Sequence, residues 1–290
     1  MKYLVILLVF SPILTFAQAT RFIYEYKFRA DSTQTDSLKT EWMYLDINKG
    51  GSKYYSKGAF ERDSLLYENV RKQMASGMRS VSISRQSGGD DVDYKVEKTH
   101  PDYKTHLITN VGNDSYRVLE DRKLNWTISA DKKQLGEFKV QKATTDFGGR
   151  KWTAWFTTEL PFQEGPYKFQ GLPGMIVEVS DTTGSHRMEL KGVKKITETK
   201  QEELDTKGKD IPLLGRKPIE VSRQQYVKLK KQYENDPVQG MREMLNRPNS
   251  TVKINMNGTE ISDPKEILKT MEKVAKDEIA RNNNQIELLP

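Results

Sequence analysis

The chain has no cysteine among its 290 residues. It therefore has no disulfide bonds, and it lacks the N-terminal cysteine that would make the exported form a lipoprotein. Histidine is also rare, with only His100, His106 and His186. A zinc site would need these three residues to converge with a carboxylate from distant segments. We therefore expect no metal site and no cofactor.

Motifs that mark common enzyme classes are missing as well. The sequence has no Gly-x-Ser-x-Gly nucleophile elbow, no phosphate-binding P-loop, no dinucleotide-binding fingerprint and no His-Glu-x-x-His zinc motif. Asp90, Asp91 and Asp93 form an acidic run after Gly88-Gly89, which we interpret as a solvated loop rather than a cation site. These absences favour a protein that is not an enzyme.

Charge is not concentrated in one place. The chain has 47 Lys and Arg residues against 40 Asp and Glu residues, a net charge of +7. The two signs are interspersed along the whole sequence, whereas nucleic-acid binding requires a basic patch or stripe. We therefore interpret the basic excess as a solvated surface and expect no nucleic-acid partner.

The N-terminus has the three parts of a secretory signal peptide, which we place at residues 1–19. Lys2 supplies the positive charge, residues 3–10 are apolar, and Ala17-Gln18-Ala19 is a small-residue cleavage signal. Cleavage after Ala17 or after Ala19 fits equally well. An uncleaved signal anchor is the alternative, but Ser11-Pro12 interrupts an apolar run that is shorter than the roughly 20 residues of a membrane span. No later stretch reaches that length, so we expect a periplasmic or secreted protein without a transmembrane segment after cleavage.

Residues 20–196 have the pattern of an antiparallel β-rich domain with one short helix. In residues 21–29, Phe22, Tyr24, Tyr26 and Phe28 alternate with more polar residues, which is strand periodicity with one aromatic face. Close spacing of the strands favours an antiparallel meander over parallel β-α-β units. The predicted helix covers residues 62–74, and the further predicted strands cover residues 41–48, 52–56, 92–97, 104–110, 115–119, 125–129, 137–145, 151–158, 175–180 and 186–193.

Beyond a polar linker or mobile loop at residues 197–221, residues 222–290 change to a helical composition. Ser222 with Gln225 is a capping box, Asp236-Pro237 and Asp263-Pro264 are helix starts, and Asn257-Gly258 is a hairpin turn between residues 251–256 and 259–261. The last helix has one apolar stripe, which we expect to pack on the sheet; a partner helix or a membrane surface is the alternative. The predicted fold is mainly β with C-terminal helices (α+β): a curved antiparallel sheet or open half-barrel packed by helices.

The segment from Gly149 to Ile176 is the most distinctive part of the chain. It contains, in order, Gly149-Arg150-Lys151-Trp152-Thr153-Ala154-Trp155-Phe156-Thr157, Leu160-Pro161, Gly165-Pro166-Tyr167-Lys168-Phe169 and Gly171-Leu172-Pro173-Gly174-Met175-Ile176. In order and spacing this segment resembles the GLPGLI family of exported bacterial proteins, which is named for the last motif. Phe60 after Lys57, Asn283-Asn284 and Ile286-Glu287-Leu288 are similar to family features too. Met175 replaces the Leu of the family name, and Val140 stands where many members carry Cys, so no thiol role applies here.

The resemblance implies a setting rather than a reaction. The family is similar in setting to envelope proteins of Gram-negative bacteria rich in energised outer-membrane transporters, and it has no established enzymatic activity. Its strand-rich core looks like the open half-barrels that bind lipoproteins or lipids in the periplasm. The expected partner is thus an envelope or outer-membrane protein, or else an apolar ligand.

Eight residues of the motif region form the candidate binding set. Pro173 and Gly174 suit the two central positions of a type II turn, so the motif has a purely structural interpretation. In the functional alternative, Gly171 and Gly174 let a ligand or partner approach beside a wall of aromatic side chains. Trp152, Ala154 and Phe156 share one face of their strand, and Trp155 points to the other. The candidate set is Trp152, Trp155, Tyr167, Phe169, Gly171, Leu172, Pro173 and Gly174.

The sequence thus favours an exported, non-enzymatic binding or accessory module associated with outer-membrane transport. The alternative is a periplasmic carrier of a lipid or other apolar ligand. A carrier retains an apolar molecule in a cavity, whereas an accessory module binds another protein.

The first testable prediction concerns processing. Because Lys2 and the following apolar residues direct export, N-terminal sequencing of the protein from envelope fractions is expected to begin at Gln18 or Thr20. Recovery of an intact Met1 from the same fractions would contradict the signal-peptide interpretation.

Overall fold

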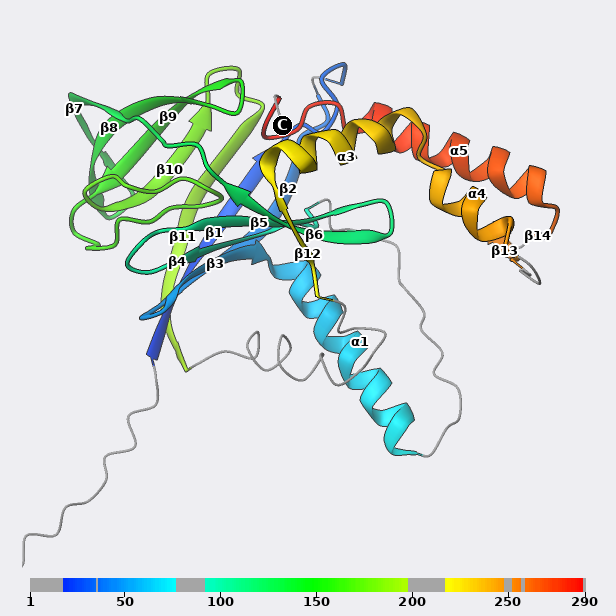
Figure 1. The fold of residues 1–290 in the computed structure, drawn as a ribbon. Coiled ribbons are helices and arrows are strands. Elements are labelled where there is room, and N and C mark those ends of the chain that lie inside the picture. The colour runs from blue at the N-terminus through cyan, green and yellow to red at the C-terminus, as the bar shows by residue number, and fades with distance from the viewer. Residues whose placement is uncertain are drawn as a thin grey trace, which may run out of the picture.

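The computed structural model describes residues 18–34, 36–76, 92–197, 217–247, 252–256 and 259–288. Residues 1–17 of the predicted signal peptide and most of the polar segment predicted at 197–221 lie outside these ranges. The described residues form a twelve-stranded sheet and a separate two-stranded hairpin (Figure 1). The strands of the large sheet are β1 (Gln18–Phe28), β2 (Lys39–Asn48), β3 (Gly51–Ser56), β4 (Lys95–Thr99), β5 (Thr105–Val111), β6 (Asp114–Glu120), β7 (Thr127–Leu135), β8 (Phe138–Phe147), β9 (Arg150–Thr157), β10 (Met175–Asp181), β11 (His186–Thr197) and β12 (Ile219–Ser222).

The sheet consists of two antiparallel meanders that meet at β1. Its strand order is β12-β6-β5-β4-β3-β2-β1-β11-β10-β9-β8-β7. β1 pairs antiparallel with β2 on one side and with β11 on the other. The expected antiparallel pairing is confirmed among β1 to β11, although it forms two meanders, whereas β12 pairs parallel to β6 and makes the sheet mixed. The two edge strands, β12 and β7, do not pair with each other, so the sheet is not closed.

The core lies on one face of this sheet and is rich in aromatic side chains. The alternating residues of β1 are buried as predicted, with Phe22 and Tyr24 at 0% exposure. On β9, Trp152, Ala154 and Phe156 are buried on the same side, while Trp155 is on the other face and half-buried. Each such side chain contributes roughly 1.5–3 kcal/mol through removal of apolar surface from water. The strand alternation in the sequence therefore identifies the main hydrophobic contribution to stability.

Residues 158–174 form a loop between β9 and β10 that is held against the core by a buried ion pair. The ammonium of Lys98 donates to Glu164 Oε2 at 2.9 Å and to the carbonyl oxygens of Gly165 and Phe169 at 3.0 Å each. Ser52 Oγ and His100 Nε2 contact the other carboxylate oxygen at 3.0 and 2.8 Å. Burial alone would raise the pKa of Glu164, but Lys98 and the two hydrogen bonds lower it. These hydrogen bonds together offset the free energy needed to bury the charges of Lys98 and Glu164.

The Gly-Leu-Pro-Gly segment at the end of this loop is not a type II turn. The Gly174 amide donates to the Leu172 carbonyl oxygen at 2.7 Å, and the Met175 amide donates to Leu160 at 3.2 Å instead of closing a four-residue turn. The chain therefore makes a three-residue turn about Pro173. Gly174 is needed for a close approach rather than for that turn, because a Cβ there would lie 2.1 Å from the carbonyl oxygen of Thr157.

Helix α1 (Lys57–Ala75) begins five residues before the predicted start at residue 62. The Ser56 hydroxyl accepts a hydrogen bond from the Ala59 amide at 3.0 Å and caps the helix. Ser56 is also the last residue of β3, so the strand pattern hides the cap in the sequence. α1 contacts β2 and β3 near its start and then projects away from the sheet (Figure 1).

The C-terminal region contains α3 (Arg223–Asn235), α4 (Gln239–Leu245), the hairpin β13 (Ile254–Met256) and β14 (Thr259–Ile261), and α5 (Pro264–Arg281). The Ser222–Gln225 capping box and the Asp263 cap are confirmed. The start predicted at Asp236-Pro237 is wrong, because α4 begins at Gln239 without a side-chain cap. Asp236 ends α3 instead, and its carboxylate accepts from Arg242 at 2.7 Å. The predicted Asn257-Gly258 turn lies outside the described residues, and the strands beside it pair antiparallel.

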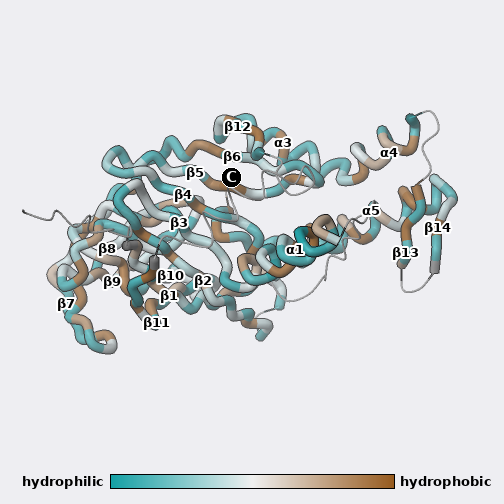
Figure 2. The backbone as a smooth tube through the Cα atoms, turned by 90° about the horizontal axis from the view of Figure 1, so that it is seen from below, coloured by the Kyte–Doolittle hydropathy of each residue, from teal (hydrophilic) through white to brown (hydrophobic). Residues whose placement is uncertain are grey.

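Only part of the C-terminal region lies on the sheet. α3 contacts β5, β6 and β12, while α4 and α5 contact each other and extend beyond the sheet (Figures 1 and 2). Of the apolar stripe of α5, Ile267 is buried and Val274 is 43% exposed. No helix in the described part of the chain combines the length and the apolar character needed to cross a bilayer.

The contact of Gly174 gives a prediction for stability. Gly174→Ala is expected to lower the free energy of unfolding by about 2 kcal/mol or more, because the backbone of Thr157 must move to admit the methyl group. Gly240→Ala is the control: nothing lies within 4 Å of its Cβ position in α4, and alanine there stabilises by about 0.5–1 kcal/mol. Denaturant titration of both variants measures the difference. Equal stability of Gly174→Ala and the wild type would refute the close-packing role.

Candidate functional site

The residues after α5 cross the sheet as an extended segment, residues 282–288, which we call the C-terminal strap. The Asn284 amide donates to the Ala30 carbonyl oxygen at 2.9 Å, and the Leu288 amide donates to Gly148 at 2.8 Å. Gly148 has φ +61°, and a Cβ there would lie 2.8 Å from Cγ of Glu287. The turn between β8 and β9 therefore needs glycine both for its backbone conformation and for contact with the strap.

Arg150, at the start of β9, anchors the first half of the strap. Its guanidinium donates to Asp181 Oδ2 at 2.9 Å on one side and to Asn284 Oδ1 at 2.6 Å and the Gln285 carbonyl oxygen at 2.7 Å on the other. The side chains of Arg150 and Asp181 are 4% and 1% exposed. Because the guanidinium is planar and charged, these bonds fix the position of the strap relative to β9 and β10.

His186, on β11, forms the next contact with the strap. Its Nε2 lies 3.1 Å from the Asn284 carbonyl oxygen and its Nδ1 lies 2.7 Å from the hydroxyl of Tyr26. Since a carbonyl oxygen can only accept, Nε2 carries the proton and Nδ1 accepts from Tyr26. The imidazole is therefore neutral in this arrangement. Burial, together with the nearby charge of Arg150, lowers the pKa of His186 to about 4.

A four-charge cluster anchors the second half of the strap. The Glu287 carboxylate accepts from the Tyr167 hydroxyl at 2.5 Å, from Lys168 Nζ at 2.5 Å and from Arg122 at 2.6 Å. Both cations also bind Glu120, at 2.7 Å from Lys168 and 2.6 Å from Arg122. Burial would raise the pKa of Glu120, but Arg122 and Lys168 lower it to about 2. Two carboxylates and two cations thus balance one another at the strap.

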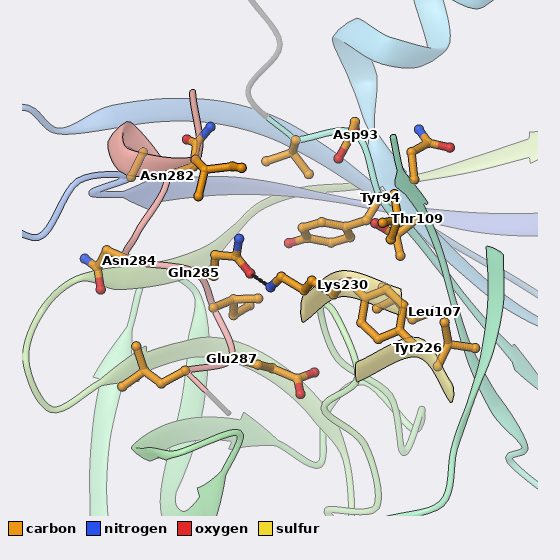
Figure 3. Close-up of a pocket in the computed structure, with 18 of the residues that line it drawn as sticks. Asp93, Tyr94, Leu107, Thr109, Tyr226, Lys230, Asn282, Asn284, Gln285 and Glu287 are labelled. Carbon is orange, nitrogen blue, oxygen red and sulfur yellow. Dashed lines mark hydrogen bonds between the residues drawn. The ribbon is translucent and has the colours of Figure 1, made fainter. Parts of the chain in front are cut away.

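Beside the strap lies an open cavity of about 820 Å³, bordered by the sheet, α3, α5 and the strap itself (Figure 3). Its size falls within the range of small-molecule binding sites, roughly 300–1,000 Å³. The apolar part of its lining comes from β5, β6, α3, α5 and the strap and includes Leu107, Val111, Val118, Tyr226, Ile279 and Ile286. Polar groups from the residues just before β4 and from α3, among them Tyr94 and Lys230, reach the same space.

The candidate binding residues mostly lie in the core rather than in this cavity. Trp152, Phe169 and Leu172 are at most 1% exposed, and the rings of Trp152 and Phe169 are 4.8 Å apart. Of the eight, Tyr167 alone belongs to the cavity lining. Trp155 lies on the opposite face of β9 with Lys133 Nζ 4.0 Å from its ring centre. Gly171 and Pro173 are exposed, and Gly174 is packed on Thr157.

The strap anchors were not part of the candidate set. Arg150, Lys168, Asn284 and Glu287 all belong to the segments that resemble the GLPGLI pattern, but the residues near 150–168 and near 284–287 are far apart in the chain. The structure brings these two segments together. The three histidines are separated: His100 contacts Glu164, His106 lies on β5, and His186 binds the strap. In the described part of the chain, no group of three or more His, Asp or Glu residues could hold a metal ion.

Comparison with known proteins gives a short match to one family and matches to solved structures. Residues 148–178 match a family model described as "Protein of unknown function (Porph_ging)". This match runs from the strap-binding glycine into β10. No curated protein matches the chain.

Two crystal forms of PNGF-II, in space groups C2 and P21, are similar in structure, with TM-scores of 0.50 and 0.51 and 14% sequence identity. The match covers 75% of this chain and 34% of PNGF-II in each case. At this level of identity the likeness shows the fold alone: mostly β, with a large sheet and helices.

His186 gives a prediction for pH dependence. Its folded-state pKa of about 4 is below the unfolded value of about 6.5, so the unfolded state binds more protons between these values. The free energy of unfolding is therefore expected to be highest above pH 6.5 and to fall by on the order of 3 kcal/mol as the pH decreases towards 4. Urea titrations at pH 7.5, 5.5 and 4.5 measure the change.

His186→Gln serves as the comparison, because it removes the titrating group. The variant is expected to be less stable at pH 7.5 but to lose less further stability between pH 6.5 and 4.5 than the wild type. Glu120, with a pKa near 2, contributes only below about pH 4.5. Parallel pH profiles for wild type and variant would show that His186 is not the group responsible.

Proposed function

We propose that this chain is an exported protein of the bacterial cell envelope, and that it is a non-enzymatic binding module whose ligand occupies the cavity beside the C-terminal strap. The observation that carries the proposal is the cavity itself. It combines the volume of a small-molecule site with a lining that mixes apolar side chains with polar and charged ones. The buried charges of Arg150, Lys168 and Glu287 hold the strap in place, and the strap forms one wall of the cavity.

The proposed export is supported by the N-terminal sequence and is compatible with the first strand. Ala19 is 3% exposed and pairs with Ile196. Cleavage after Ala17 keeps this pair in the sheet, whereas cleavage after Ala19 removes it. We therefore propose Gln18 as the mature N-terminus and periplasmic or secreted as the location. We also propose membership of the GLPGLI group, since the matched segment 148–178 and the strap carry the residues of that resemblance.

The cavity favours a carrier of a lipid or other apolar ligand over an accessory protein. An accessory role in outer-membrane transport is the second candidate. The observation in its favour is the arm formed by α4, β13, β14 and α5, which extends beyond the sheet (Figure 1) and leaves Met244 and Val274 exposed. A small-molecule experiment separates the two candidates, because only the first requires the cavity.

The test uses the neutral dye Nile red, whose emission shifts to the blue in apolar surroundings. Wild-type protein is expected to bind the dye with one-to-one stoichiometry in a fluorescence titration. Thr109→Trp introduces an indole into the cavity from β5 and is expected to weaken binding at least tenfold. Ile108→Trp is the matched control, because Ile108 is the neighbouring residue on β5, is about as buried, and does not line the cavity.

Melting temperatures of both variants establish that they are folded. Equal dye affinity in Thr109→Trp and Ile108→Trp would place the bound dye elsewhere and contradict the proposal. A wild-type protein that does not bind the dye would leave the accessory role as the better candidate.

A further inference from the structure

Lys230 is a cation of the cavity that has no carboxylate partner. Its ammonium extends from α3 and hydrogen-bonds the side-chain amide oxygen of Gln285 on the strap (Figure 3). Within the described ranges, no Asp or Glu lies at ion-pair distance from it, although Glu234 and Glu287 are near enough to act on its charge. Burial still lowers the pKa of Lys230. The ammonium, which is only partly buried, thus has an amide oxygen rather than an anion as its partner.

Tyr94 supplies a second donor whose hydrogen-bonding capacity is not used. Its hydroxyl is buried near the hydroxyl of Tyr26, and it makes no hydrogen bond of ordinary length among the described residues. A buried polar group left in this state costs about 1–3 kcal/mol. Figure 3 shows the ring of Tyr94 extending into the cavity on the side where Lys230 meets Gln285. Two donors therefore face one region, and an acceptor from a ligand would satisfy both.

Two other cations that line the cavity are already neutralised. Arg122 and Lys168 are both bound by Glu120 and Glu287. A ligand therefore gains little from them, whereas the amide oxygen of Gln285 occupies the position that a ligand oxygen would take beside Lys230. One ammonium and one hydroxyl suit a singly charged group with two oxygens; a phosphate dianion needs more donors.

Resting on the function proposed above, we propose that the cavity binds a small amphipathic carboxylate. Its carboxylate receives hydrogen bonds from Lys230 Nζ and the Tyr94 hydroxyl, displacing the side chain of Gln285, which is exposed. Its apolar body lies against Leu107, Tyr226 and Ile279. A medium-chain fatty acid has this chemistry.

The experiment compares dodecanoate with dodecan-1-ol by isothermal titration calorimetry on the full chain at pH 7.5, below micelle-forming concentrations. The two probes share an apolar chain and differ in the head group. Dodecanoate is expected to bind at least tenfold more tightly. Lys230→Met is expected to remove this preference while leaving the affinity for the alcohol unchanged, and Tyr94→Phe is expected to weaken dodecanoate binding several-fold. Lys228→Met, on the exposed side of α3 and outside the cavity lining, is the control for loss of one positive charge.

Equal affinity for acid and alcohol would overturn the carboxylate assignment while leaving the cavity as a binding site. The assignment is also overturned if Lys230→Met and Lys228→Met change dodecanoate binding to the same extent. If neither probe binds, the assignment fails, and the Nile red titration then decides whether the cavity binds any apolar molecule.

Discussion

The bonds of one buried guanidinium determine how the rest of this structure is arranged around the cavity. Arg150 joins β9 to β10 through Asp181, and it joins both strands to the chain's last residues through Asn284 and Gln285. A buried ion pair of this kind contributes little net stability compared with apolar residues, but removing one partner leaves an uncompensated charge that costs about 3–5 kcal/mol. The strap is therefore held in one position rather than merely attracted to the sheet, and the cavity wall depends on that position.

The loop between β9 and β10 connects the core to this wall. Near its start, Glu164 is bound by Lys98 from β4. A few residues later, Tyr167 and Lys168 bind Glu287 of the strap. The rings of Tyr167 and Phe169 pack between these two polar contacts, 6.2 Å apart. The most distinctive motif of the sequence thus has a structural role, because it contacts both the core and the strap and fixes one relative to the other. Most of its aromatic residues are buried and therefore cannot contact a partner.

Much of the fold follows from local patterns in the sequence. Alternation of apolar residues identifies the strands, and side-chain caps identify the starts of α3 and α5, because these signals depend on near neighbours. The start of α4 could not be predicted from the sequence. Asp236 is a residue type that often caps helices, but here its carboxylate accepts a hydrogen bond from Arg242 and does not cap α4. The site was largely missed for a different reason. No periodicity distinguishes a surface lysine or glutamate from Lys168 or Glu287, whose burial arises from residues more than 100 positions apart. The aromatic residues of the motif suit ligand binding, but the same apolar surface also packs a hydrophobic core.

The central position of β1 has a consequence for how the chain reaches this structure. Ten residues separate β1 from its partner β2, whereas its other partner, β11, ends at Thr197, which pairs with Gln18. When the chain emerges N-terminus first, strands β1 to β6 can pair before β11 is present. One edge of β1 then has unpaired backbone N–H and C=O groups, next to the aromatic side chains of Phe22, Tyr24, Tyr26 and Phe28. Such edges recruit other strands, and closing a loop of this length is slow. The nascent chain thus passes through an interval in which association with other copies competes with folding, and a chaperone that covers β1 until residues 186–197 arrive would decide the yield of native protein.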